Sequence, residues 1–326
     1  MTGIDFVSGP AVRQTLDWSA CVEALAIVYG PGAEDSALPP RAVASTPAGN
    51  WMRVLPALPG VGDHFGLKVM GGRRGSSPTA QYLIVLFDKA SGAIVAFVDA
   101  HSITGVRTAA TSALAALHLA SRGPLRLGVL GSGLEARMHT RALVSVLDIA
   151  EVTVFSTTEA RRHAFAEELS AELGVPVRAA PTNTEAVREA ELVVAAARSH
   201  DEQPIVSAAD LKHCRTLVSI GSTVPSQREI DADLIDRADL IVCDVPGEAT
   251  AEAGDFLAAA AAGIDFTSKV HSLSDLVTGR IGGAADFALF KSVGSGLQDI
   301  AIASLALSRA RAAGLTTPLP VAFEGI

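Results

Sequence analysis

The sequence predicts an α/β protein that joins a doubly wound parallel sheet to a smaller α+β domain. Two patterns along the chain carry this prediction. In the first part, short runs of alternating apolar and polar residues are typical of an antiparallel sheet. From residue 125 onward, short apolar runs alternate with helical patterns, which indicates parallel strands joined by right-handed crossovers. A chain of 326 residues is long enough for two domains.

Composition and charge exclude several other classes of protein. Hydrophobic residues make up 49% of the chain, so it is globular rather than disordered. The net charge of −9, without a run of Lys and Arg, argues against nucleic acid or an anionic membrane as a partner. No apolar run approaches the length of a transmembrane helix, and the first residues, MTGIDFVSG, lack a signal-peptide pattern.

Cysteine and histidine spacings indicate neither disulfides nor a metal site. Cys21, Cys214 and Cys243 stand far apart without CxxC spacing, which is typical of reduced, buried thiols. The eight histidines show no ligand spacing, so no metal is expected. We therefore expect a cytoplasmic protein.

The first domain begins with a short strand within residues 1–16 and a helix from Asp17 to Tyr29. Asp17 is a suitable N-cap, and apolar residues recur on one side of the helix that follows. Alternation then predicts strands at residues 41–46, 51–58 and 65–70, a hairpin of residues 82–87 and 93–98, and finally a helix over residues 102–120.

Residues 125–147 organise the second domain. The apolar run LRLGVL ends at Gly131-Ser132-Gly133, Ala136 follows, and a helical pattern begins. Gly131 permits a tight turn, Gly133 lets the backbone approach a pyrophosphate, and Ala136 lets the helix lie close to the strand. Because a helix N-terminus favours phosphate, this pattern predicts a Rossmann-type dinucleotide-binding unit. A tight strand-to-helix turn without a ligand is the alternative.

Five more strands continue the parallel sheet. They are expected at residues 152–155, 175–179, 192–197, 217–221 and 240–245. A last helix over residues 296–313 has the composition to leave this sheet and return to the first domain. The predicted division is residues 1–120 with 304–326 for the smaller domain, and residues 121–303 for the nucleotide-binding domain.

The end of the second strand of this sheet favours NADP(H) over NAD(H). NAD-selective sheets usually place Asp or Glu there, about 20 residues past the glycines, to bind the ribose hydroxyls. Here the strand ends in Ser156-Thr157-Thr158, with Arg161 and Arg162 nearby. Hydroxyl groups and a cation suit a 2′-phosphate. The alternative is that both arginines only form a solvated helix face.

Four motifs occur in order along residues 39–310. They are Gly66-Leu-Lys68-Val-Met70, Arg107-Thr-Ala-Ala-Thr-Ser112, Gly131-Ser-Gly-Leu-Glu-Ala136, and Leu289-Phe-Lys-Ser-Val-Gly294 followed by Gln298-Asp299. Together they resemble the ornithine cyclodeaminase/mu-crystallin family, which includes cyclodeaminases, alanine dehydrogenases and imino-acid reductases. The resemblance implies a homodimer in which the smaller domain binds substrate and forms the dimer.

The resemblance also implies catalytic and substrate-binding roles for Arg41, Lys68 and Arg107. Three cations from separate elements suit the carboxylate of an imino or amino acid. Lys68 is the candidate proton relay, and Val293 matches a position beside the substrate. From the residues alone, two alternatives stay open: Arg41 is exposed, or the side chain of Lys68 points to solvent.

The cofactor contacts expected from the motif, the strand ends and the resemblance lie on several elements. They are Thr79, Gly131, Ser132, Gly133, Leu134, Glu135, Ala136, Ser156, Thr157, Thr158, Arg161, Ala196, Ala197, Gly221, Ser222, Thr223 and Ser292.

One departure from the family pattern bears on the reaction. The resemblance implies a pattern Gly-x-Asp-x-Pro in cyclodeaminases and in the family's alanine dehydrogenases, in which the Asp transfers protons. This chain has Thr223 at the Asp position. A hydroxyl cannot replace a carboxylate as a base near neutral pH. We therefore predict an NAD(P)H-dependent oxidoreductase that reduces the C=N bond of an imino acid or cyclic ketimine. The alternatives are an ornithine cyclodeaminase-type cyclisation and a mu-crystallin-like protein that only binds NADPH and a small ligand.

Overall fold

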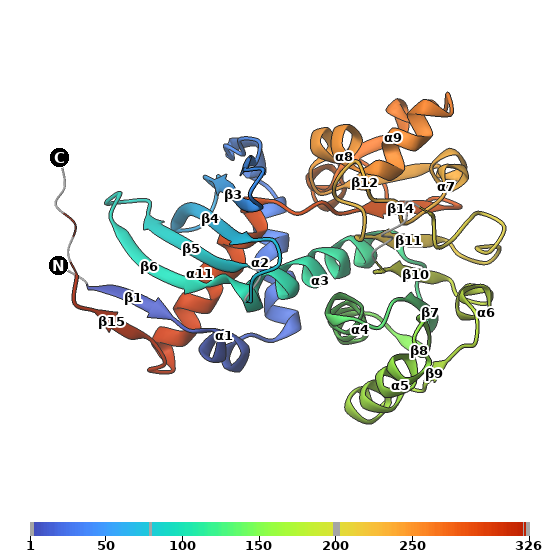
Figure 1. The fold of residues 1–326 in the computed structure, drawn as a ribbon, viewed down its shortest axis with the longest axis horizontal. Helices are drawn as coiled ribbons and strands as arrows, with labels where there is room; N and C mark the ends of the chain where they lie inside the picture. The colour runs from blue at the N-terminus through green and yellow to red at the C-terminus, as the bar shows by residue number, and fades with distance from the viewer. Residues whose placement is uncertain (1–2, 78–79, 198–202, 322, 324–326) are drawn as a thin grey trace. The chain divides into compact units, whose positions relative to one another are not determined.

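The chain forms two compact units in the computed structural model, which describes residues 3–77, 80–197, 203–321 and 323. The first unit contains the residues up to Arg107 and those from Ser295 onward, and the second contains Thr108–Gly294. One boundary falls within α3 (Ala100–Leu119), and the other lies directly before α11 (Gly296–Ala312). Each unit is built on its own sheet (Figure 1).

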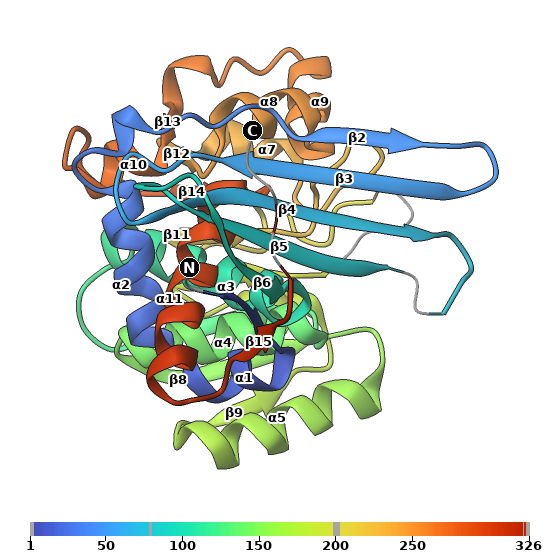
Figure 2. The same cartoon turned by 90° about the vertical axis from the view of Figure 1, so that its left-hand side faces the viewer.

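The first unit contains a seven-stranded sheet in the order β15-β1-β6-β5-β4-β3-β2. Its neighbouring strands are antiparallel except for the parallel pair of β1 and β6. All strands predicted between residues 41 and 98 are confirmed, and Figure 2 shows β2 to β5 side by side. The strands are β1 (Ile4–Val7), β2 (Ala42–Ser45), β3 (Asn50–Ala57), β4 (His64–Arg73), β5 (Gln81–Asp88), β6 (Ile94–Asp99) and β15 (Thr317–Leu319).

Helix α11 packs against one face of this sheet, and α2 (Trp18–Tyr29) packs against α11 (Figure 1). The predicted cap of α2 is confirmed, because the backbone N of Ala20 donates to Asp17 Oδ1 at 2.9 Å. Helix α1 (Gly9–Thr15) was not predicted, because it is too short to show a helical period.

The register of the strands divides the sheet into a covered face and an open face. Lys68 pairs with Leu55 and Ile84, so these side chains share one face, and all three are buried. Strand residues alternate between faces, so the neighbours of Lys68 and Ile84 lie on the other face. They are apolar and only half-buried: Leu67, Val69, Leu83 and Val85.

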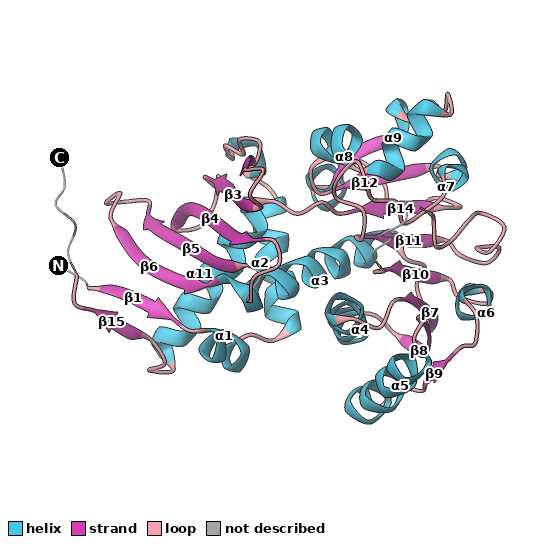
Figure 3. Ribbon diagram, viewed as in Figure 1, coloured by secondary structure: helices cyan, strands magenta, loops and turns pink. Residues whose placement is uncertain are grey.

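The second unit is a doubly wound parallel sheet, as predicted, and its eight strands lie in the order β13-β12-β14-β11-β10-β7-β8-β9. Helices flank it, with α4 and α5 on one side of β7 and β8 and α6 on the other (Figure 3). The strands are β7 (Leu125–Leu130), β8 (Ile149–Phe155), β9 (Val177–Ala179), β10 (Leu192–Ala195), β11 (Thr216–Ser219), β12 (Leu240–Cys243), β13 (Val270–Ser272) and β14 (Ala288–Lys291). The helices are α4 (Leu134–Val146), α5 (Glu159–Leu173), α6 (Asn183–Val187), α7 (Ala232–Arg237), α8 (Pro246–Glu252), α9 (Gly254–Ala261) and α10 (Leu273–Val277).

Two strands of this sheet were not predicted. β13 lies at one edge, and β14 lies between β11 and β12 in the middle of the sheet. The four residues of β14 are fully buried, but the last of them is Lys291, so the strand is not a purely apolar run in the sequence. The buried lysine also needs a partner inside the unit.

Candidate active site

A buried cluster of charged side chains lies in the first unit, on β4, α3 and α11. Lys68 Nζ lies 2.9 Å from Asp299 Oδ1, and Arg107 Nε donates to the same oxygen at 3.2 Å. Lys68 and Asp299 are fully buried, and Arg107 is 7% exposed. One carboxylate oxygen therefore holds two cations from separate elements beside each other.

Neighbouring groups fix the orientation of these cations. Arg107 Nη1 donates to Gln298 Oε1 at 2.9 Å, and Gln298 Nε2 donates to the hydroxyl of Tyr29 at 2.9 Å. Lys68 Nζ lies 3.3 Å from Thr104 Oγ1. Such fixed positions are what a site needs to orient a substrate.

Burial and neighbouring charges change the acidity of Lys68. Loss of water around the ammonium lowers its pKa most, Asp299 opposes this effect, and Arg107 adds to it. The resulting pKa is about 8. Lys68 is therefore protonated at neutral pH but gives up its proton more readily than an exposed lysine, as a proton donor must.

The other oxygen of Asp299 indicates that the cluster is incomplete. Oδ2 is buried and has no hydrogen-bond partner among the residues that the structure describes. Buried acceptors of this kind are uncommon, and they mark places where a ligand or water completes a network.

The register places Arg41 on the same face of the sheet as Lys68. Ala42 pairs with Val54 on the antiparallel strand β3, so the preceding residue, Arg41, lies opposite Leu55. Leu55 pairs with Lys68, so all three lie in one row across the sheet. Arg41 is half-buried. Lys68 is fully buried, so the alternative in which its side chain points to solvent is wrong.

Asp299 and Gln298 were not predicted to belong to the site, although both are part of one of the four motifs. The available signal was a carboxylate inside the apolar start of the last helix, because a charge buried in this way needs a cation. Their partner Arg107 is 192 and 191 residues away along the chain, so spacing alone cannot reveal the contact.

The glycine loop of the second unit has the geometry that a dinucleotide requires. Gly131 has a φ of +118°, and a Cβ there would lie 2.6 Å from the carbonyl oxygen of Ala196. A Cβ at Gly133 would meet no atom within 4 Å, so the space beside the N-terminus of α4 is open. Ala136 is fully buried. These positions fit a tight turn, an approach to phosphate and close helix packing.

Other expected cofactor contacts lie near this loop in the fold. Leu134 and Glu135 form the first turn of α4, residues 196 and 197 follow β10, and residues 221–223 follow β11. Because β7, β10 and β11 are parallel neighbours, their carboxyl ends lie at one edge of the sheet, where doubly wound sheets bind ligands. Thr79 lies outside the described residues.

Ser292 and Val293 follow β14 and are held by Asp244. Ser292 Oγ donates to Asp244 Oδ2 at 2.7 Å, and the backbone N of Val293 donates to Oδ1 at 2.9 Å. The hydroxyl of Ser292 is thus already engaged within the unit, and its expected contact with the cofactor stays a prediction.

The two arginines of the predicted 2′-phosphate site, Arg161 and Arg162, are consecutive residues at the start of α5 and differ in exposure. Arg162 Nη1 donates to the carbonyl oxygen of Ser156 at 3.1 Å, and Ser132 Oγ donates to Ser156 Oγ at 2.8 Å. Arg162 therefore braces the loop. Residues 157–161 are exposed, and they include Thr157, Thr158, Glu159 and Arg161.

The model of one protein family, the ornithine cyclodeaminase/mu-crystallin family, matches residues 25–314. The chain belongs to this family. The match covers the second sheet, strands β2 to β6 of the first sheet, the glycine loop and the charged cluster, so the family assignment applies to both units.

Relatives in this family include two reductases. The Δ1-pyrroline-2-carboxylate reductase of Bacillus cereus is 26% identical over 80% of this chain and 82% of its own. Ketimine reductase mu-crystallin of Rattus norvegicus is 28% identical over 78% and 79% of the two chains. A solved Δ1-pyrroline-2-carboxylate reductase of Thermococcus litoralis, in complex with NADH and L-proline, matches with a TM-score of 0.89 at 22% identity, over 97% of this chain and 100% of the other. That structural match shows a shared fold.

Within the described ranges, residues 3–77, 80–197, 203–321 and 323, the side chains form no metal-binding group and the helices include no membrane span. No group of three or more His, Cys, Asp or Glu side chains in them is arranged to hold a metal ion. None of the helices in these ranges is both long and apolar enough to cross a membrane.

Proposed function

We propose that this protein is an NAD(P)H-dependent oxidoreductase that reduces the C=N bond of an imino acid or cyclic ketimine. The buried cluster of Lys68, Asp299 and Arg107 carries the proposal, because it provides fixed cations for a carboxylate and a lysine suited to proton transfer. Membership of the family and the names of two reductase relatives support the same reaction.

Arg41 and the three residues of the cluster have different roles in the proposed reaction. Arg107 and Arg41 bind the substrate carboxylate, since a guanidinium matches its two oxygens. Protonated Lys68 donates a hydrogen bond to the imine nitrogen, which makes the adjacent carbon more electrophilic. Asp299 is a positioning residue that keeps both cations in place. The reduced nicotinamide, when bound, supplies the hydride.

The second unit supports the nucleotide part of the proposal. Open space at Gly133 and the left-handed conformation of Gly131 fit a pyrophosphate at the start of α4. We favour NADP(H), because Arg161 and the two threonines before it are exposed after β8. The first carboxylate after this strand is Glu159, in the first turn of α5.

The residue at position 223 argues against ornithine cyclisation. Thr223 offers a hydroxyl, which is not a base near neutral pH, where that reaction needs a carboxylate. A protein that only binds NADPH and a ligand has no need of a buried lysine with a lowered pKa.

An absorbance assay tests this function. The protein is mixed with NADPH or NADH and a panel of imino acids, including Δ1-pyrroline-2-carboxylate, with the matching keto acids without amine as controls. We expect at least one imino acid to cause oxidation of the nucleotide, and we expect none of the keto acids to do so. Ammonia release from ornithine with NAD⁺ would contradict the proposal and show that the protein is a cyclodeaminase. Nucleotide binding without turnover of any substrate would show that it is only a binding protein.

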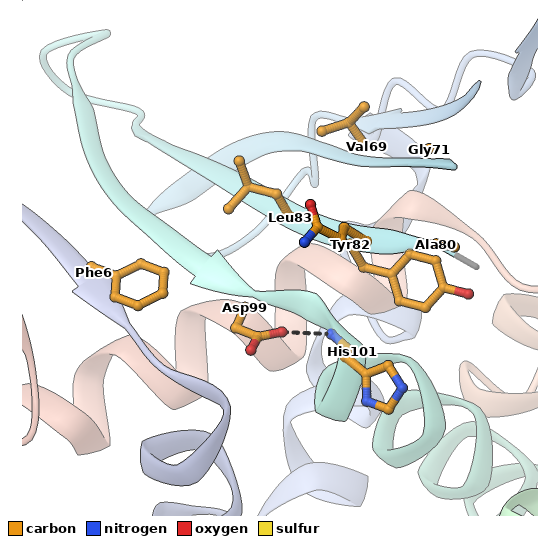
Figure 4. Close-up of a pocket in the computed structure, with 9 residues that line it drawn as sticks. Phe6, Val69, Gly71, Ala80, Tyr82, Leu83, Asp99 and His101 are labelled. Carbon is orange, nitrogen blue, oxygen red and sulfur yellow. Dashed lines mark hydrogen bonds between the residues drawn. The ribbon is translucent and has the colours of Figure 1, made fainter. Parts of the chain in front are cut away.

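We also infer that two copies associate through the open face of the first unit. A groove of about 670 Å³ lies on this face, lined by Phe6, Val69, Leu83 and neighbouring residues (Figure 4). The half-buried apolar residues around it extend across β4 and β5, and such faces usually meet another protein surface. A second copy is the occupant that the family resemblance implies. A cytoplasmic location stays a prediction.

A further inference from the structure

Three charged residues that the proposed reaction does not use lie inside the second unit. Glu229, Asp255 and Lys291 are all fully buried. They lie beside the carboxyl ends of β10, β11 and β14, the sheet edge at which a doubly wound fold binds its ligand. Burying three ionisable groups is costly unless each is held by partners.

Glu229 joins the ends of two strands. Its Oε1 accepts from the backbone N of Ala197 at 3.0 Å, after β10. Its Oε2 accepts from the backbone N of Ile220 at 3.0 Å and of Gly221 at 2.8 Å, after β11, and from Ser219 Oγ at 2.8 Å. One carboxylate thus receives four donors and fixes the two loops relative to each other.

The fit around this carboxylate is tight. A Cβ at Gly221 would lie 2.2 Å from Glu229 Oε1, so a larger residue at this position would displace the carboxylate. The loop after β10 also borders the glycine loop, because a Cβ at Gly131 would meet Ala196. Glu229 therefore holds two segments, at Ala197 and Gly221, that we expect to contact the dinucleotide.

The charges around Glu229 do not balance. Lys291 on β14 donates to Asp255 on α9 at 2.8 Å and to Ser219 Oγ at 2.9 Å. Asp255 Oδ1 accepts from the backbone N of Glu229 at 2.7 Å. One ammonium thus faces two carboxylates. Burial raises the pKa of Glu229 most. The positive charge of Lys291 lowers it, the negative charge of Asp255 raises it further, and the resulting pKa is about 7.

We propose that Glu229 is a positioning residue for the nicotinamide half of the dinucleotide, and that its ionised form holds the loops after β10 and β11 in the shape that binds the cofactor. A protonated carboxyl carries an O–H that needs an acceptor. The three backbone N–H groups around it can only donate, so among the four groups that contact Glu229 only the hydroxyl of Ser219 can rotate and accept. The loops then lose part of their anchor. Affinity for the nucleotide falls as the pH falls through the pKa of Glu229. This inference rests on the proposed function, because it requires a nucleotide.

The test is the dissociation constant of the nucleotide between about pH 6 and about pH 8, on either side of the pKa of Glu229. Fluorescence titration is done with NADH as well as NADPH, since NADH lacks the 2′-phosphate that titrates in the same range. For the wild type we expect NADH binding to weaken about ten-fold toward the lower pH, a coupling of ordinary size between linked sites.

Two variants and a control separate this role from a merely structural one. Glu229→Gln cannot ionise, so it should bind weakly at both ends of the range with a flat pH profile. Ser219→Ala removes a donor to the carboxylate, so the midpoint should move to higher pH; this variant carries the test if Glu229→Gln does not fold. Glu167→Gln, the same change at an exposed position on α5, should keep the wild-type profile.

The outcomes distinguish the two proposals. Wild-type binding with no pH dependence, or the same midpoint in wild type and Ser219→Ala, overturns the role of Glu229 and leaves the proposed function standing. Failure of the wild type to bind either nucleotide at any pH overturns both.

Discussion

Asp299 sets the charge balance of the cluster in the first unit, because it is the carboxylate that contacts both Lys68 and Arg107. In Asp299→Asn the attraction that keeps Lys68 protonated is lost, so the pKa of Lys68 falls below its present value of about 8. A charge at this distance changes a pKa by about 1 to 3 units. Activity that needs protonated Lys68 declines as the pH rises through this pKa, so the decline should begin at lower pH in the variant.

The measurement is the pH profile of kcat/KM for the wild type and Asp299→Asn. Asp286→Asn, the same change at a side chain that is 99% exposed in the second unit, is the control and should keep the wild-type profile. A profile that is identical in all three proteins would show that Lys68 does not donate the proton.

Arg107→Lys tests whether Arg107 binds the substrate carboxylate. Lysine keeps the charge, but its single ammonium cannot reproduce the separate contacts of Nε with Asp299 and Nη1 with Gln298. Charge-assisted hydrogen bonds are worth roughly 1.5–3 kcal/mol, so kcat/KM should fall by about ten-fold to several hundred-fold. Nucleotide affinity should hardly change, and normal turnover of the variant would place Arg107 outside the site.

Two cations of the cluster were easier to single out from the sequence than the carboxylate that they share. Lys68 and Arg107 were predicted from short motifs, and the structure places them on one oxygen. Asp299 was not assigned, because nothing local shows that the last helix packs on the face of β4 that carries Lys68. Glu229 likewise looks like an ordinary polar residue until the strands are assembled around it.

At the scale of elements, the proposed preference for NADPH over NADH rests on the turn from β8 into α5. Arg162 is engaged with the backbone of Ser156, whereas Arg161 is exposed. Arg161→Ala should therefore weaken NADPH binding roughly ten-fold or more, the worth of a charge-assisted hydrogen bond, and leave NADH binding unchanged. Parallel titrations measure this, with Arg178→Ala, a 70% exposed arginine on β9, as the control. Equal loss for both nucleotides would mean that Arg161 does not read the 2′-phosphate.

Elements with a clear period were predicted well, whereas α1 and β14 were not predicted. The cap at Asp17 and the alternation in β3 to β6 act locally, so they are visible in the sequence. β14 ends in a lysine and becomes a strand only because partners inside the unit hold that charge. Tertiary contacts therefore decide the elements that local pattern leaves ambiguous.

At the scale of the whole molecule, the open sheet face predicts the oligomeric state. Leu83→Asp places a carboxylate in the centre of the half-buried apolar residues of β4 and β5, where a second copy would have to bury it. Light scattering should show a dimer for the wild type and a monomer for the variant. Leu257→Asp, at an exposed leucine on α9, should remain dimeric. A wild-type monomer would overturn the inference.

The position of β14 has a consequence for how the chain is synthesised. This strand comes late in the sequence, yet it lies between β11 and β12. Until the ribosome has released residues 288–291, both neighbours therefore expose an unpaired strand edge, the kind of surface that aggregates. The first unit also waits for its last helix and for β15. A nascent chain that stops before Ala288 thus lacks the central strand of one sheet and the covering helix of the other. Neither unit can complete its fold before this point, so the nascent chain exposes surfaces that chaperones bind.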